Sequence, residues 1–408
     1  MSILFSRARK LDAAGQVDDF WMLVEGDTIV EVGTGTPPPA SAVEVDLAGA
    51  WLTPGFIDLH SHGGGGFSYD DDVEAIRGAL AIHRAHGTTR SVLSLVAAPI
   101  ASLEKSLSTI AGIAAADPLV LGSHLEGPYL ATARRGAHDP RFLRDPQPAE
   151  LDRLLDAAHG TLRQLTIATE LPNALELIQI LVENEVVVAI GHTEADFELA
   201  RTAFDVGARL LTHAFNAMPG IGHRAPGPVV AAFEDPRVTV ELILDGEHVH
   251  PDVAALTFRS APGRVALITD AMAAAGAGDG HYELGSVDVE VKNGVARLAG
   301  TGSLAGTDAL AGSQSLAGSQ SLAGSQSLAG SESLAGSTLT QDRALRLAIE
   351  RVGVPLAEAV GAVTLTPARV LGLESRHGLL APGYVADAVQ LDSQWQVRRV
   401  WANGEALG

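Results

Sequence analysis

Apolar segments that are typical of buried β-strands recur along this chain, and each one ends in a potential metal ligand or an acid. The clearest is Gly-Phe-Ile-Asp-Leu-His-Ser-His at 55–62, and four others end near positions 126, 192, 213 and 270. In a closed parallel α/β barrel, the carboxyl ends of all strands open onto one face, where active sites lie. Polar residues that are far apart in the sequence are therefore predicted to converge on one site.

The middle of the chain contains eight strand candidates, separated by segments with helical periodicity such as 73–86, 102–116 and 194–206. The candidates span 52–59, 90–97, 119–125, 164–169, 186–190, 209–213, 237–244 and 264–269. Eight strand–helix alternations rich in Val, Ile and Leu predict an α/β fold of the (β/α)8 TIM-like barrel type. A doubly wound open sheet is the alternative, but it explains less well why polar residues end so many separate strands.

The two ends of the chain are predicted to pair into a small β-sandwich domain. Residues 21–33 form two β runs joined at Glu25-Gly26-Asp27, which is a hairpin signal. The segments 384–392 and 397–404 also have the composition of strands. We therefore assign residues 1–52 and 370–408 to the small β domain and residues 53–369 to the barrel.

One segment breaks the strand–helix alternation. From 304 to 336 the triplet Leu-Ala-Gly recurs six times at a six-residue period, mostly separated by Ser-Gln-Ser. Its small, polar, glycine-rich composition is typical of a flexible low-complexity insert. Lengthening a loop costs only roughly 0.6 kcal/mol per doubling, so the barrel can carry this insert. A β-solenoid is the alternative, but one leucine per turn offers little shared core.

The composition limits the possible partners and location. The 408 residues include 28 basic and 49 acidic side chains, which argues against nucleic acid or an anionic membrane as partner. Cysteine is absent, so any metal must be held by nitrogen and oxygen ligands. The first ten residues lack a secretory signal, and no apolar run approaches the ~20 residues of a membrane span. A cytoplasmic location is expected.

The polar residues that end the strands have the composition of a catalytic metal site with nitrogen and oxygen ligands. They are His60, His62, Glu126, His192, His213 and Asp270. Side chains two apart on a strand point the same way, so His60 and His62 can bind one ion. A single histidine is more often a hydrogen-bonded core residue, but four of them ending three strands favour a metal site. His124 is either a further ligand or, as we expect, part of the barrel packing.

The motifs around these residues resemble those of the amidohydrolase superfamily and, within it, of the N-acetylglucosamine-6-phosphate deacetylase family. They are PGFIDLHSH (54–62), HLEGP (124–128), RGAH (135–138), GHT (191–193), HAFNAM (213–218), DGEH (245–248) and TDAM (269–272). The first motif alone indicates an amidohydrolase, and HLEGP together with FNAM points to the deacetylases. The resemblance covers nearly the whole chain except the repeat.

The resemblance implies metal-dependent hydrolysis of the acetamide of N-acetyl-D-glucosamine 6-phosphate, giving D-glucosamine 6-phosphate and acetate in amino-sugar catabolism. It assigns Glu126, His192 and His213 to the main metal ion, and Asp270 to general base and then general acid. Some relatives have H-x-N in place of the first H-x-H and use one ion. His60 and His62 allow a second ion here, which Glu126 and Asp270 would also contact. Zinc is expected, with iron, manganese or cobalt as alternatives.

The resemblance also implies a homodimer and a set of residues that contact the phosphorylated sugar. These residues are Ala137, His138, Asn216, Ala217, Arg224, Asp245 and His248, and His138 is also placed to stabilise the tetrahedral oxyanion. In the family, Arg224 and His248 can reach across a dimer interface, although a solvated loop arginine is the alternative at 224. A Leu-small-Gly segment of the family lines the acetyl pocket. We assign it to the last copy, Leu334-Ala335-Gly336, because it directly precedes the segment 337–340 and the helix predicted from Asp342; the first copy, 304–306, is the alternative.

Two other functions remain open. One is another amidohydrolase, either an N-acetylgalactosamine-6-phosphate deacetylase or a cyclic amidase. Cyclic amidases often have a carboxylated lysine on the fourth strand, where this chain has Leu165-Thr-Ile-Ala-Thr-Glu170 and no lysine. The other is a non-catalytic scaffold, a class of protein that usually loses metal ligands, whereas this chain keeps all of them.

Overall fold

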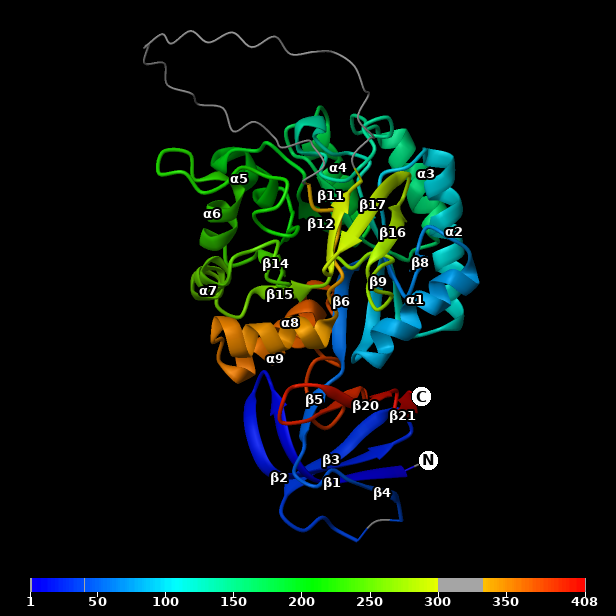
Figure 1. Cartoon of the computed structure of the whole chain (residues 1–408), viewed down its shortest axis with the longest axis vertical. Coiled ribbons are helices and arrows are strands. Elements are labelled where there is room, and N and C mark those ends of the chain that lie inside the picture. Colours follow the sequence, from blue (N-terminus) through cyan, green and yellow to red (C-terminus); the bar gives the residue numbers. More distant parts are fainter. Residues whose placement is uncertain (1, 40, 300–332, 408) are drawn as a thin grey trace.

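The computed structural model describes residues 2–39, 41–299 and 333–407, and it places a barrel beside a smaller β-rich unit that holds both chain ends (Figure 1). Eight parallel strands form the barrel sheet in the order β15-β14-β13-β12-β11-β10-β9-β6. The Asp270 N–H donates to the His60 carbonyl at 2.8 Å, and the His62 N–H donates to the Ala271 carbonyl at 2.7 Å. These bonds join the end of β15 to β6 and close the barrel, as predicted.

The barrel strands begin and end close to the predicted positions. They are β6 (Phe56–Ser61), β9 (Thr88–Leu95), β10 (Val120–Glu126), β11 (Leu162–Ile167), β12 (Val187–Ile190), β13 (Leu210–Leu211), β14 (Thr239–Ile243) and β15 (Val265–Ile268). Nearly all of their side chains are buried, because helices cover the outside of the sheet and the strands enclose the interior. The strand predicted at 209–213 is shorter than expected.

The strand predicted at 52–59 is wrong as a single element. Residues Trp51–Pro54 form β5 of the small sheet, and the barrel strand β6 begins only at Phe56. Gly55 lies between them, and a Cβ atom there would be 2.2 Å from Thr89 Oγ1. The chain thus passes from one sheet to the other at a point where only glycine fits.

Helices connect the barrel strands and pack around them (Figure 1). They are α1 (Val73–Ala85), α2 (Ile100–Ala116), α3 (Pro148–Ala158), α4 (Ala174–Glu183), α5 (Phe197–Asp205), α6 (Gly227–Glu234), α7 (Pro251–Ser260), α8 (Gln341–Leu347), α9 (Leu356–Val363) and α10 (Leu365–Val370). Asp196 caps α5 by accepting a hydrogen bond from the Leu199 N–H. In the described part of the chain, no helix combines the length and apolar character needed to cross a bilayer.

Both chain ends contribute to the small β unit, as predicted. Its strands are β1 (Ser2–Asp12), β2 (Gly15–Glu25), β3 (Thr28–Thr34), β4 (Val43–Asp46), β5, β19 (Ala388–Leu391), β20 (Val397–Ala402) and β21 (Glu405–Leu407). They follow the order β21-β20-β19-β5-β1-β2-β3, with β4 beside β1, and β2 and β3 form the predicted antiparallel hairpin. The exact domain boundaries, after residues 52 and 369, stay predictions.

A three-stranded antiparallel sheet that was not predicted follows β15. It consists of β16 (Gly280–Leu284), β17 (Val287–Lys292) and β18 (Val295–Leu298). The Leu298 N–H donates to the Ser333 carbonyl at 3.0 Å, and the Ala335 N–H donates to the Ala296 carbonyl at 3.2 Å. The last Leu-Ala-Gly copy therefore pairs with β18, whereas the five copies before it lie outside the described residues.

Deletion of residues 305–334 is expected to give a folded, active protein whose melting temperature equals or exceeds that of the parent. The deletion leaves one Leu-Ala-Gly and puts Ser303 and Leu304 in the positions of Ser333 and Leu334. Residues 299–302 would then link Leu298 to Ser303, a length within the usual range for hairpin loops. Because loop entropy varies only logarithmically with length, the change in stability should be small.

Thermal unfolding and an acetate-release assay on the deletion protein check this expectation. Poor folding of the deletion protein would contradict the loop hypothesis. Strong hydrogen-exchange protection across 307–333 in the parent would contradict it equally, because it would mean that the repeats form a stable structure.

Candidate metal centre

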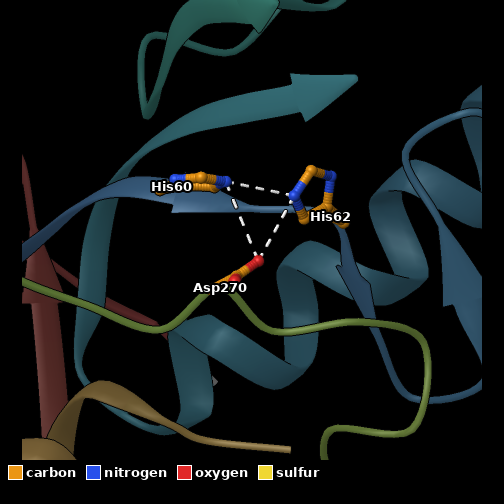
Figure 2. Close-up of side chains that lie close together, drawn as sticks. All are labelled: His60, His62 and Asp270. Carbon is orange, nitrogen blue, oxygen red and sulfur yellow. Dashed lines mark hydrogen bonds and ion pairs between the residues drawn. The ribbon is translucent and has the colours of Figure 1, made fainter. Parts of the chain in front are cut away.

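The first group of potential ligands consists of His60, His62 and Asp270, which face one another (Figure 2). His60 and His62 belong to the carboxyl end of β6 and the residue beyond it, and Asp270 follows β15. The two Nε2 atoms are 3.1 Å apart, and Asp270 Oδ1 lies 3.8 Å from His60 Nε2 and 3.4 Å from His62 Nε2. The predicted same-side orientation of the two histidines is thus present.

The second group consists of Glu126, His192 and His213, at the ends of β10, β12 and β13. Glu126 Oε1 lies 3.1 Å from His192 Nε2 and 3.0 Å from His213 Nε2, and these two nitrogens are 3.0 Å apart. All three side chains are buried.

Glu126 joins the two groups into one centre. Its Oε1 is 3.5 Å from His60 Nε2, and its Oε2 is 3.3 Å from His62 Nε2. The six residues predicted as metal ligands and general base therefore converge on one place, although they are spread from position 60 to position 270.

The donor set of this centre fits a divalent cation. Within each group two Nε2 atoms face each other, so their lone pairs repel unless a proton or a cation lies between them. Burial lowers the pKa of His60, but Glu126 and Asp270 outweigh it and raise that pKa well above its ordinary value. Burial likewise opposes ionisation of Glu126, yet His60 and His138 hold its pKa well below the usual range. The cluster thus favours added positive charge, and imidazole and carboxylate are the ligands that zinc and related metals take.

The backbone at the strand ends is unusual in the same place. His192, His213 and Asp270 have φ angles of 46°, 26° and 47°, in or near the left-handed region that residues other than glycine seldom adopt. Residues with strained backbone of this kind are concentrated at functional sites, where the surrounding structure maintains their conformation. Three of the six predicted residues therefore carry a second, independent sign of function.

Hydrogen bonds on the far side of the rings orient two of the histidines. His192 Nδ1 lies 2.8 Å from the Arg134 carbonyl, and His60 Nδ1 lies 3.4 Å from Glu241 Oε2. Such partners fix the tautomer and orientation of a metal-binding histidine. His124 has other partners, Ser94 Oγ at 2.9 Å and Thr166 Oγ1 at 2.8 Å, and lies outside both groups.

A cavity of about 440 Å³ opens above the centre and is large enough for a phosphorylated sugar. Seven of the residues predicted to bind substrate line it: Ala137, His138, Asn216, Ala217, His248, Leu334 and Gly336. Asp245 accepts from His248 Nδ1 at 2.7 Å, and Ala335 is buried and does not line the cavity. Arg224 does not line the cavity and is exposed on the surface.

Several residues of the site were not predicted. Arg134 and Phe215 line the cavity beside the RGAH motif and within HAFNAM, so the motifs themselves were a signal. Leu284 comes from the unpredicted sheet and had no such signal. Glu241 is a buried acid within the strand 239–243, and the sequence shows this acid but not its contact with His60.

Comparison with known proteins agrees with this geometry. A profile described as Amidohydrolase family matches residues 51–407. An Asp-to-Ala variant of N-acetyl-D-glucosamine-6-phosphate deacetylase from Mycobacterium smegmatis, solved in complex with N-acetyl-D-glucosamine-6-phosphate, is 41% identical with a TM-score of 0.88 over 99% of both chains.

Two curated relatives differ in the sugar that their names give. N-acetylgalactosamine-6-phosphate deacetylase of Escherichia coli O157:H7 is 38% identical over 98% of both chains. N-acetylglucosamine-6-phosphate deacetylase of Vibrio furnissii is 32% identical over 87% of this chain and 82% of its own. The chain belongs to the amidohydrolase family and, within it, to the group of the N-acetylglucosamine-6-phosphate deacetylases.

Proposed function

We propose that this chain hydrolyses the acetamide of N-acetyl-D-glucosamine 6-phosphate to D-glucosamine 6-phosphate and acetate, with one or two divalent ions. The observation that carries the proposal is the pair of ligand groups sharing Glu126 at the base of a cavity of about 440 Å³. The relative solved with that sugar phosphate supports the choice of substrate. Zinc, a homodimer and a cytoplasmic location are parts of the same proposal.

Glu126, His192 and His213 would hold one ion, and His60, His62 and Asp270 the other. When bound, a divalent cation in such a site acts as a Lewis acid and makes water a stronger nucleophile at neutral pH. Proton transfer, stabilisation of the oxyanion and binding of the phosphate are assigned to side chains of the protein.

Asp270 is proposed to move the proton. Burial opposes its ionisation, but His60 and His62 outweigh burial and keep the pKa of Asp270 below its usual range, so it is a carboxylate at neutral pH. It accepts a proton from water as the water oxygen bonds to the acetyl carbon. It then gives that proton to the sugar nitrogen as the C–N bond breaks, which leaves the amine and acetic acid; the acid's remaining proton passes to the amine, so the products are acetate and the sugar ammonium.

His138 is proposed to stabilise the oxyanion as a neutral hydrogen-bond donor. The Ala97 N–H donates to His138 Nδ1 at 3.3 Å, so the ring hydrogen is on Nε2, which faces Glu126 Oε2 at 3.2 Å. Burial lowers the pKa of His138 to about 4, so the ring stays neutral at pH 7. His138 lines the cavity, and an N–H at its wall can bind the carbonyl oxygen as its negative charge grows.

His248 and Arg224 are proposed to bind the phosphate. Burial works against charge on His248, but the hydrogen bond to Asp245 outweighs it and raises the pKa of His248. Arg224 is exposed outside the cavity wall. This position suits the proposed homodimer, in which Arg224 would enter the cavity of the other subunit.

Replacing Arg224 or His248 with alanine is expected to raise the Michaelis constant for the phosphorylated sugar roughly ten-fold or more. This is the scale of one lost charge-assisted contact, about 1.5–3 kcal/mol. Steady-state kinetics on unphosphorylated N-acetylglucosamine serve as the control, because that reaction should scarcely change. Equal losses on both substrates would show that these residues are structural.

The 4-epimer, N-acetyl-D-galactosamine 6-phosphate, is the second candidate substrate, and the relative that is 38% identical over 98% of both chains favours it. The kcat/KM values for the two epimeric sugar phosphates, measured with one metal-loaded preparation, decide between them. The proposal expects the larger value for the gluco epimer. A larger value for the galacto epimer would overturn the choice of substrate and leave the chemistry of the centre intact.

A further inference from the structure

Glu241 is a carboxylate that contacts one residue of each ligand group. Its side chain lies on β14 and is completely buried. Its Oε2 is 3.4 Å from His60 Nδ1 and 3.4 Å from the backbone nitrogen of His213. Its Oε1 accepts from Gln164 Nε2 at 3.0 Å. Glu241 thus contacts the first group through a side chain and the second through the main chain.

Among the described residues, Glu241 is paired with a histidine, His60, and with no permanently charged side chain such as a lysine or arginine. Burying a carboxylate among apolar side chains is costly unless an opposite charge compensates it. A cation bound to the other nitrogen of His60 would supply that charge, in the carboxylate–histidine–metal arrangement common to metal sites.

The hydrogen bond also determines which nitrogen of His60 faces the cluster. A carboxylate can only accept, so the hydrogen that His60 keeps when it binds a metal is the one on Nδ1, which leaves the lone pair of Nε2 for the ion. That Nε2 points toward His62 Nε2 and Asp270 Oδ1, at 3.1 and 3.8 Å (Figure 2). His213 depends on Glu241 only through its backbone N–H, which any oxygen acceptor can satisfy.

We propose that Glu241 is a positioning residue that makes His60 a metal ligand and thereby enables the centre to hold a second ion. The inference adds to the proposed function a residue that selects two-ion over one-ion occupancy. It rests on the metal dependence of that function and not on the identity of the sugar, so metal binding can test it without substrate.

Glu241→Gln keeps the shape of the side chain and removes its charge, and it is expected to fold. Gln164 Oε1 is buried and has no hydrogen-bond partner among the described residues. If the side-chain amide of Gln164 rotates by half a turn, its Oε1 can accept a hydrogen bond from the NH2 group of the new glutamine. The carbonyl oxygen of the new glutamine can still accept from His60 Nδ1 and from the His213 N–H. Glu241→Leu removes both the charge and the acceptor and should have the larger effect.

Metal content after dialysis against graded concentrations of free zinc, measured by mass spectrometry, tests the proposal. The parent should bind two ions per chain. Glu241→Gln should keep one and bind the other about 10–100-fold more weakly, which is the usual effect of losing such a partner. A parent that never exceeds one ion, a Glu241→Gln protein with unchanged affinity for both ions, or one that loses both ions equally, would overturn the proposal.

His124→Gln is the matched control. The His124 ring is buried with its centroid 4.6 Å from that of His60, but its hydrogen bonds go to Ser94 and Thr166 and to no proposed ligand. It should keep both ions, and loss of the second ion in this variant too would mean that any change in the core has the same effect. In a His60→Asn background, Glu241→Gln should weaken zinc binding no further, because the two residues act through one contact. An additive loss would contradict the mechanism.

Discussion

Asp270→Asn is expected to lower turnover by at least ~10³-fold, the scale of removing a general acid–base group, while the fold and most of the bound metal remain. The amide of asparagine cannot accept the proton of water at neutral pH. Asparagine tolerates left-handed backbone better than most residues, so the φ of 47° at this position should persist. Steady-state acetate release and metal analysis of the same preparation give the two results.

Asp288→Asn is the control for this variant, because Asp288 is exposed on β17 and away from the cluster. It should behave as the parent does. If Asp270→Asn keeps turnover within tenfold of the parent, Asp270 is not the proton carrier, and a different group must move the proton.

Glu126→Gln is expected to reduce the affinity of the protein for both ions and to lower turnover by at least ~10³-fold, because several kcal/mol of metal-derived stabilisation are lost. The reason is that Glu126 lies within 3.5 Å of one histidine nitrogen or more in each group. A glutamine keeps the shape but loses the negative charge that faces the four histidines. Zinc titration of metal-stripped protein measures the affinity.

Glu194→Gln is the control, because it makes the same chemical change outside both ligand groups. Glu194 is half exposed and pairs with Arg134 at 3.2 Å. Its metal content should equal that of the parent. Unchanged zinc binding in Glu126→Gln would show that Glu126 does not join two ion sites.

The convergence of the candidate ligands was predictable because two simple regularities act together. Side chains alternate along a strand, which placed His60 and His62 on one side, and parallel barrel strands end on one face, which brought His192, His213 and Asp270 together. The motifs then indicated the surrounding cavity, including Asn216, Ala217 and His248. Each of these inferences depends on a local pattern in the chain.

What could not be predicted depends on distant contacts. Glu241 reaches His60 only because β15 closes against β6, which brings β14 near the first strand of the barrel. Leu284 reaches the cavity because the three-stranded sheet packs there; the alternation of 287–292 and the turn Asn293-Gly294 indicate a hairpin but do not say where it packs. The break at Gly55 follows from the approach of Thr89, a residue of the next strand.

The central claim is that the two ligand groups around Glu126 support metal-dependent deacetylation, and a zinc titration of acetate release tests it most directly. Metal-stripped protein receives increasing equivalents of zinc, and the rate of acetate release from N-acetyl-D-glucosamine 6-phosphate is measured at each step. We predict almost no release before zinc is added, a rise with added zinc, and saturation by two equivalents per chain. Equal rates with and without zinc, or a fully loaded protein that releases no acetate, would contradict the claim.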